Sequence, residues 1–78
     1  MKEQILAVLK EIKSTVDLSE VTDIIDGAYL DSMELMALIG ALEETFQIEI
    51  DIMDIEPENF NSVAAMAAMV EKRKGDAL

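Results

Sequence analysis

Hydrophobic residues recur at intervals of three and four along most of this chain, which is the spacing of one face of an α-helix. At the start of the chain Ile5, Leu9, Ile12 and Val16 form such a stripe, which Leu6 and Val8 widen. Lys10 and Lys13, near the end of this stretch, suit the negative C-terminal end of a helix. We therefore expect a first helix over residues 1–13.

The helical pattern fades over residues 14–31, which form a loop of unusual length for a compact domain. The pair Asp26-Gly27 is its clearest turn signal. Apolar side chains can pin the loop to the core, namely Val21, Ile24, Ile25 and Leu30. We expect this loop to be ordered.

The strongest helical pattern covers residues 32–46. One face is apolar and consists of Leu35, Leu38, Ile39, Leu42 and Phe46. The other face carries Met33, Met36, Ala37, Gly40, Glu43 and Glu44. Methionine adapts its shape and is common on surfaces that bind several partners, so this second face is interpreted as a recognition surface. The alternative is that Met33 or Met36 packs beneath the preceding loop.

Residues 51–56 predict a short third helix. It should end before Pro57, because the residue that precedes a proline disfavours helical geometry. Ile52 and Ile55 would then point toward the core, and the acidic residues between them would face solvent.

Residues 62–74 predict the last helix. Asn61 or Ser62 can serve as its N-cap. Its buried stripe would be Val63, Met66, Ala67 and Val70. Gly75 is a natural C-cap, so residues 75–78 should form a frayed tail.

Together these elements predict an all-α fold, a small antiparallel bundle of three long helices and one short helix. The 78 residues make a single domain, residues 1–78, which buries only about 60–65% of the surface of its unfolded chain. No apolar run approaches the roughly 20 residues of a membrane span, and the N-terminus lacks the pattern of a signal peptide. We expect a cytoplasmic monomer without stable membrane insertion.

The charge of the chain narrows its possible partners. Six basic residues stand against 17 acidic ones, for a net charge of −11, and no Lys or Arg occurs between Ser14 and Glu71. Such a chain repels nucleic acid, so nucleic acid is excluded as a partner. It suits docking onto basic patches of enzymes, with an attraction that weakens as salt rises. An acidic surface also keeps a small protein soluble, so charge alone does not decide between these roles.

Candidate chemistry is confined to one serine. The chain has no Cys and no His, which excludes a thiolate nucleophile, an imidazole base and a conventional zinc site. Its acidic stretches lack the ligand spacing of a calcium loop, so we expect no metal site. Because the chain has no pair of a base and a nucleophile, we also expect no catalytic residue.

Ser32 follows Asp31, a good N-cap, and Glu34 completes the pattern of a capping box. Ser32 would therefore occupy the first helical position with its hydroxyl free. A phosphate attached there is favoured by roughly 0.3–1 kcal/mol, because the N-terminus of a helix carries partial positive charge. Most Asp-Ser pairs only cap a helix, so this pair alone indicates an attachment site weakly.

The surrounding sequence resembles the acyl carrier proteins and their peptidyl and D-alanyl relatives. In that family an Asp-Ser-Leu or Asp-Ser-Met motif opens the second helix, as Asp31-Ser32-Met33 does here. A Leu-Glu-Glu-x-Phe segment and an Ile-x-Ile segment follow, as in residues 42–46 and 48–50. The resemblance implies that a phosphopantetheinyl transferase moves 4′-phosphopantetheine from coenzyme A onto Ser32. It also implies that Asp31 caps the helix and helps to position the transferase.

The resemblance further implies a non-catalytic carrier that holds acyl groups as thioesters on the thiol of the arm. It would deliver them to acyl-transferring enzymes with basic docking patches, in fatty-acid, lipid or secondary-metabolite synthesis. The docking residues would be Met33, Met36, Ala37, Gly40, Glu43 and Glu44.

Some residues depart from the usual pattern of the family. Ala37 stands where fatty-acid carriers usually have an acidic residue, and Gly40 where a larger apolar residue is usual. These departures favour a dedicated carrier for a lipid, secondary-metabolite or cell-envelope pathway. Two alternatives stay open: a D-alanyl or other aminoacyl carrier, and an acidic helical interaction domain that needs no modification.

Overall fold

The computed structural model describes residues 1–76, which form helices joined by loops. The elements are α1 (Lys2–Ile12), α2 (Ser32–Phe46), the 3₁₀-helix η1 (Ile52–Asp54), α3 (Pro57–Phe60) and α4 (Val63–Asp76). No strand occurs in the described part of the chain. This confirms the predicted all-α fold with three long helices.

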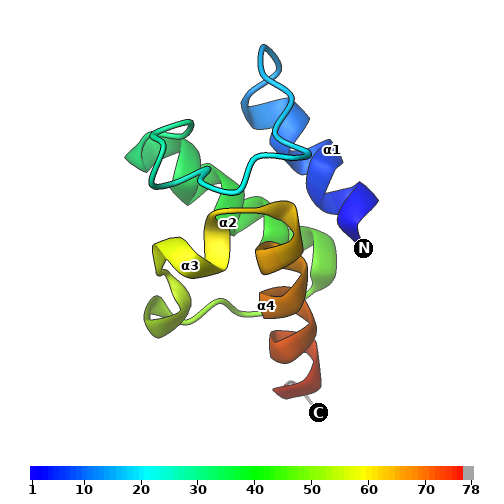
Figure 1. Ribbon diagram of the computed structural model, residues 1–78. Coiled ribbons are helices and arrows are strands. Elements are labelled where there is room, and N and C mark those ends of the chain that lie inside the picture. The colour runs from blue at the N-terminus through cyan, green and yellow to red at the C-terminus, as the bar shows by residue number, and fades with distance from the viewer. Residues whose placement is uncertain (77–78) are drawn as a thin grey trace.

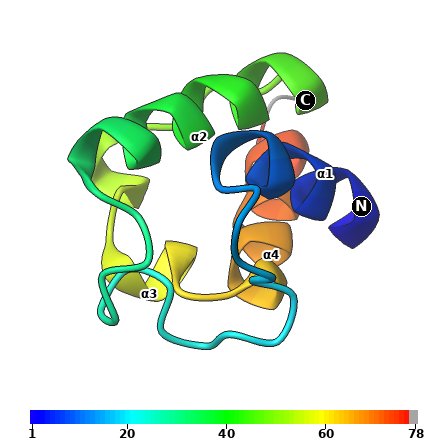
Figure 2. The same ribbon diagram turned by 90° about the horizontal axis from the view of Figure 1, so that it is seen from above.

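Helices α1 and α2 lie side by side and run in opposite directions, as both views show (Figures 1 and 2). Helix α4 crosses this pair and contacts both of its members. The short elements η1 and α3 lie toward the end of the molecule at which α2 begins (Figures 1 and 2). The first residues of α2 therefore lie at one end of the bundle.

The core lies where the apolar faces of the long helices meet. Its largest fully buried side chains are Ile5, Leu9, Ile24, Leu38, Leu42, Phe60, Met66 and Val70. Burying one such side chain contributes roughly 1.5–3 kcal/mol relative to leaving it exposed. No polar or charged side chain is buried among the described residues, so the packing of apolar groups holds the bundle together.

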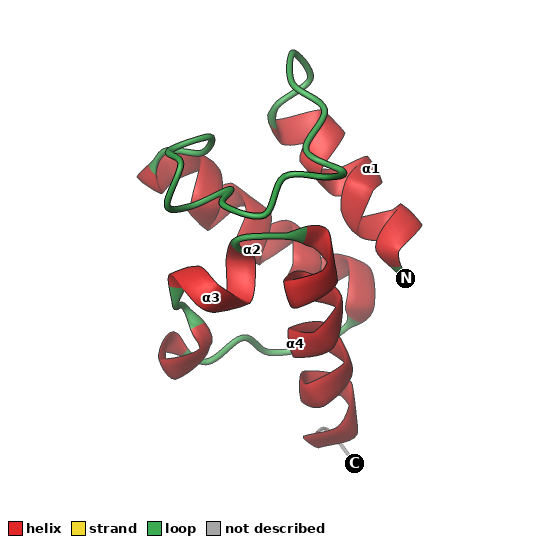
Figure 3. Cartoon of the chain, viewed as in Figure 1, coloured by secondary structure: helices red, strands yellow, loops and turns green. Residues whose placement is uncertain are grey.

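The loop between α1 and α2 is anchored in this core through buried side chains, namely Leu18, Ile24 and Leu30. Figure 3 shows it crossing from the end of α1 to the start of α2. Asn61 also holds the loop in place through hydrogen bonds. Its backbone carbonyl accepts the Ile24 N–H at 2.9 Å, and its Oδ1 accepts the N–H groups of Ile25 at 2.9 Å and Asp26 at 3.1 Å. The loop is thus tied to the junction between α3 and α4.

Of the short helix predicted over residues 51–56, a helical turn is present, but the predicted inward orientation of Ile52 is wrong. Only one 3₁₀ turn forms there, and Ile52 is 79% exposed instead of pointing toward the core. The Asp51 side chain accepts the Met53 N–H at 3.0 Å, while the Asp54 side chain accepts the Asp51 N–H at 3.2 Å. These reciprocal caps close the turn in a register that leaves Ile52 outside.

The segment that begins at Pro57 also differs from the prediction, which included no helix there. A further helical turn, α3, begins at Pro57. Proline suits this first helical position, because the N–H that it lacks would have no partner there.

The last helix extends further than the sequence predicts. Ser62 caps it, since the Ser62 hydroxyl accepts the Ala65 N–H at 3.0 Å, but Gly75 lies inside α4 instead of ending it. An exposed glycine lowers the stability of a helix by only about 1 kcal/mol relative to alanine, so α4 tolerates it. Of the predicted frayed tail, residues 77 and 78 lie outside the described residues.

Candidate functional site

Helix α2 begins with a reciprocal capping box. The Asp31 Oδ1 accepts the Glu34 N–H at 2.8 Å, and the Glu34 Oε1 accepts the Asp31 N–H at 2.9 Å. The capping box that the sequence predicts is therefore present. Because these two carboxylates satisfy the cap, the hydroxyl of Ser32 is not needed for it.

Ser32 is the first residue of α2 and is exposed. Within residues 1–76 its hydroxyl makes no hydrogen bond to another protein group. The positive end of the α2 dipole lies beside this hydroxyl and favours a negatively charged substituent. The site is thus an accessible hydroxyl in an environment suited to a phosphate.

A cation reaches the same capping box from α1. The Lys13 Nζ lies 3.4 Å from the Glu34 Oε1 and 3.4 Å from the Glu34 Oε2. The two side chains are 32% and 25% exposed, so this ion pair is partly shielded from solvent. The contact could not be predicted from the sequence, because its partners lie 21 positions apart.

Most of the residues expected to form a docking face are exposed. Met33 is 82% exposed and Met36 is 62% exposed, so neither packs beneath the preceding loop and that alternative is wrong. Ala37, Gly40 and Glu44 are exposed as well. The first half of α2 thus exposes two methionines within four residues of Ser32.

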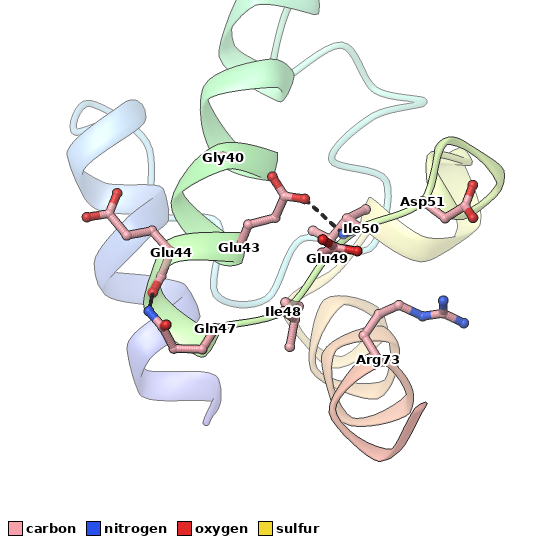
Figure 4. A pocket seen from close by; sticks show the side chains of 9 residues that line it. All are labelled: Gly40, Glu43, Glu44, Gln47, Ile48, Glu49, Ile50, Asp51 and Arg73. Carbon is pink, nitrogen blue, oxygen red and sulfur yellow. Dashed lines mark hydrogen bonds between the residues drawn. The ribbon is translucent and has the colours of Figure 1, made fainter. Parts of the chain in front are cut away.

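Glu43 behaves differently from the other acidic residue on this face. It is half-buried, and its Oε2 accepts the Ile50 N–H at 2.9 Å. In Figure 4 its side chain points toward Ile50, whereas that of Glu44 points to the opposite side of α2. Glu43 therefore has a structural role: it fixes the segment that follows α2.

An open groove of about 930 Å³ runs along the second half of α2 and reaches α4 (Figure 4). Its lining residues are Gly40, Glu43, Glu44, Gln47, Ile48, Glu49, Ile50, Asp51 and Arg73. A Cβ added at Gly40 would meet nothing within 4 Å, so the lack of a side chain leaves the α2 side of the groove open at this residue. Sequence analysis did not predict the groove, although a glycine inside a strong helical pattern is a signal for it.

A second exposed apolar pair lies on η1, where Ile52 is 79% and Met53 is 77% exposed. The turn that carries them is held at Asp54. The Asp54 carboxylate lies 3.3 Å from the Nε of Arg73, and its backbone carbonyl accepts the Asn59 side-chain amide at 2.8 Å. This apolar pair was not predicted as exposed.

Two carboxyls with shifted pKa values belong to other segments of the chain. Hydrogen bonds from the backbone and the side chain of Ser19 lower the pKa of Asp17. A hydrogen bond to Glu58 and the negative charge of that residue raise the pKa of Glu56.

No cluster of acidic residues in residues 1–76 is arranged to hold a metal ion. No helix within the same range combines the length and the apolar character that a membrane span requires.

Known proteins match this chain along most of its length. The family model described as a phosphopantetheine attachment site matches residues 3–70. The D-alanyl carrier protein of Lactococcus lactis subsp. lactis (strain IL1403) is 31% identical over 78 residues, which cover 97% of this chain and 99% of the relative. Those of L. lactis subsp. cremoris strains MG1363 and SK11 are each 32% identical over 75 residues, covering 94% of this chain and 95% of the relative. The chain therefore belongs to the phosphopantetheine-binding carrier proteins, whose members carry 4′-phosphopantetheine as a covalently attached prosthetic group.

Proposed function

We propose that this chain is an aminoacyl carrier protein in which Ser32 bears 4′-phosphopantetheine and the thiol of the arm carries a D-alanyl group as a thioester. The observation that supports the attachment most strongly is the capping box of Asp31 and Glu34, which leaves the Ser32 hydroxyl exposed and without a protein partner. Ser32 also lies within the residues matched by the family model.

The residues around Ser32 fit a phosphodiester-linked group. The hydroxyl lies at the positive end of α2, and a negative charge there is favoured by roughly 0.3–1 kcal/mol. When bound, the arm supplies a thiol, which this cysteine-free chain lacks. The chain has no histidine, so we propose that the phosphopantetheinyl transferase takes the proton of the Ser32 hydroxyl.

The relatives favour an aminoacyl cargo. All three are named D-alanyl carrier proteins and cover nearly the whole chain. None of these three relatives supports the delivery of fatty-acid, lipid or secondary-metabolite intermediates that the sequence pattern also allows. We therefore place D-alanine before an acyl chain as the group carried.

We further propose that partner enzymes dock on α2 through residues that follow Ser32, namely Met33, Met36, Ala37, Gly40, Glu43 and Glu44. These partners would be the transferase and an enzyme that loads the aminoacyl group, both with basic patches. Glu43 and Glu44 lie in the last turn of α2 without any basic residue, where the helix dipole disfavours negative charge. They do not stabilise α2 through its dipole, and they favour the approach of a cationic partner.

Intact mass spectrometry tests the attachment. The apo-protein and Ser32→Ala are each incubated with coenzyme A, magnesium and a broad-specificity phosphopantetheinyl transferase. We expect a gain of one phosphopantetheine in the unmutated protein and none in Ser32→Ala. Equal loading of Ser32→Ala would refute the assignment of Ser32.

A second step tests the cargo. The holo-protein is offered D-alanine with ATP and a D-alanine-activating ligase, and in parallel fatty acids with an acyl-activating synthetase. We expect a D-alanyl thioester that hydroxylamine releases. Loading by fatty acids but not by D-alanine would replace the aminoacyl assignment with an acyl carrier function.

A further inference from the structure

Lys13 connects the end of α1 to the start of α2. It is the C-cap residue of α1, and its backbone N–H donates to the carbonyl of Leu9 at 2.7 Å. Its side-chain Nζ lies 3.4 Å from each carboxylate oxygen of Glu34. The contact therefore bridges two helices that pack against each other.

The Glu34 side chain supplies one of the two hydrogen bonds of the capping box beside Ser32. Its Oε1 accepts both the Asp31 N–H, at 2.9 Å, and a hydrogen bond from the Lys13 ammonium, at 3.4 Å. A glutamate side chain loses rotamer freedom when it folds back onto its own helix end, which opposes the closed capping box. The Lys13 ammonium favours the closed form, because it attracts the carboxylate in the position that the box requires.

We propose that Lys13 is a positioning residue for the loading of Ser32, acting through Glu34. This proposal rests on the proposed attachment at Ser32. When the Glu34 side chain leaves the box, the N–H of Asp31, the residue directly before Ser32, loses its hydrogen-bond acceptor at the start of α2. A partner that recognises the closed start of the helix then binds with an apparent affinity reduced by the fraction that is closed.

Loss of Lys13 should affect the KM and the kcat of the transferase differently. The closed form is the one that docks, so loss of Lys13 raises the KM of the transferase for the carrier and leaves kcat unchanged. Loss of a partly exposed ion pair changes the equilibrium between the closed and the open box by about two- to fivefold, which is the upper limit of the rise in KM. A loss of overall stability would change neither constant while the protein stays folded.

Lys13 has another possible role, because a basic residue at the C-terminal end of α1 also suits the dipole of that helix. Lys10 provides the matched control. It lies in the last turn of the same helix and is exposed, and no contact joins it to the capping box in the described residues. Lys10→Gln therefore removes one positive charge near the same helix end and leaves the box intact.

The variants Lys13→Gln, Lys13→Arg, Glu34→Gln, Lys10→Gln and the double variant Lys13→Gln/Glu34→Gln test the proposal. Glu34→Gln retains an oxygen that accepts the Asp31 N–H but removes the ion pair. Each apo-protein is loaded from coenzyme A by a broad-specificity phosphopantetheinyl transferase, with KM and kcat determined separately. Hydrogen exchange of the Asp31 amide reports on the box without any loading.

We expect Lys13→Gln to raise KM and to speed exchange of the Asp31 amide, with the two factors multiplying to about two- to fivefold, because the closed fraction sets KM and the open fraction sets the exchange rate. Lys13→Arg should keep KM and the exchange rate of the Asp31 amide at the values of the unmutated protein. Lys10→Gln should also leave both unchanged. In the Glu34→Gln background, Lys13→Gln should have no additional effect, because its partner charge is already absent.

Several results would overturn the proposal. An unchanged KM in Lys13→Gln would do so, as would equal effects of Lys13→Gln and Lys10→Gln, which would indicate a general effect of charge. An undiminished effect of Lys13→Gln in the Glu34→Gln background would show that Lys13 does not act through Glu34. If the unmutated protein itself gains no phosphopantetheine, the proposed attachment at Ser32 fails and this role of Lys13 fails with it.

Discussion

Gly27 lies in the loop that leads into α2, and the structure predicts a specific cost for adding one methyl group there. A Cβ at this position would lie 2.7 Å from the backbone oxygen of Asp23, 2.7 Å from its Oδ2 and 2.9 Å from the Cε2 of Tyr29. The Asp23 carboxylate and the Tyr29 ring can rotate, but the Asp23 carbonyl also accepts the Gly27 N–H at 2.6 Å. The backbone itself must therefore shift to admit the methyl group.

We expect Gly27→Ala to lower the free energy of unfolding by about 1–3 kcal/mol, the usual effect of overpacking a tight site. For a domain of this size the melting temperature falls by about 4–8 °C for each kcal/mol. Urea unfolding followed by circular dichroism measures the change, with an unaltered slope as the sign that the unfolded state is unaffected.

Gly40→Ala is the matched control for this prediction. Its new Cβ meets nothing within 4 Å, and Gly40 lies inside α2, where alanine is favoured over glycine by about 1 kcal/mol. The two glycine variants should thus change stability in opposite directions. A Gly27→Ala protein as stable as the unmutated one would refute the tight packing of this loop.

Three further predictions concern the site and its surroundings. Asp31→Ala should lower the free energy of unfolding by about 0.5–2 kcal/mol through loss of the N-cap, whereas Asp31→Asn should retain most of it; equal losses in urea unfolding would contradict the cap. Glu44→Lys should raise the KM of the transferase and flatten its salt dependence, and unchanged kinetics would exclude Glu44 from docking. The pKa of Glu56 is raised above 4.5 in the folded protein, so this group favours folding below its unfolded pKa and opposes it at neutral pH. Glu56→Gln should therefore stabilise the protein at neutral pH, with the difference vanishing in acid, and a gain confined to low pH would contradict the sign.

Features that depend on neighbouring residues could be predicted from the sequence. The apolar stripe of α2 has a helical period, and its predicted members Leu38, Leu42 and Phe46 are buried. The capping box joins residues only three positions apart, so Asp31 and Glu34 reveal it directly. The same local reading correctly gives Ser32 the first position of α2.

Features that depend on distant residues could not be predicted. The sequence allows either Asn61 or Ser62 to cap α4, but the Asn61 side chain instead holds residues about 35 positions away. The role of Glu43 depends on a hydrogen bond to Ile50, and that of Lys13 on a residue 21 positions away. The exposure of Ile52 follows from the reciprocal caps of η1, which a simple count of apolar spacing does not reveal.

Mass spectrometry can locate the residue that carries the arm, which we propose is Ser32. The protein is loaded from coenzyme A, digested, and the modified peptide is fragmented to identify the residue that carries phosphopantetheine. We expect a single modified residue, Ser32. Phosphopantetheine on Ser14, Ser19 or Ser62, or no modification of the folded protein, would contradict it.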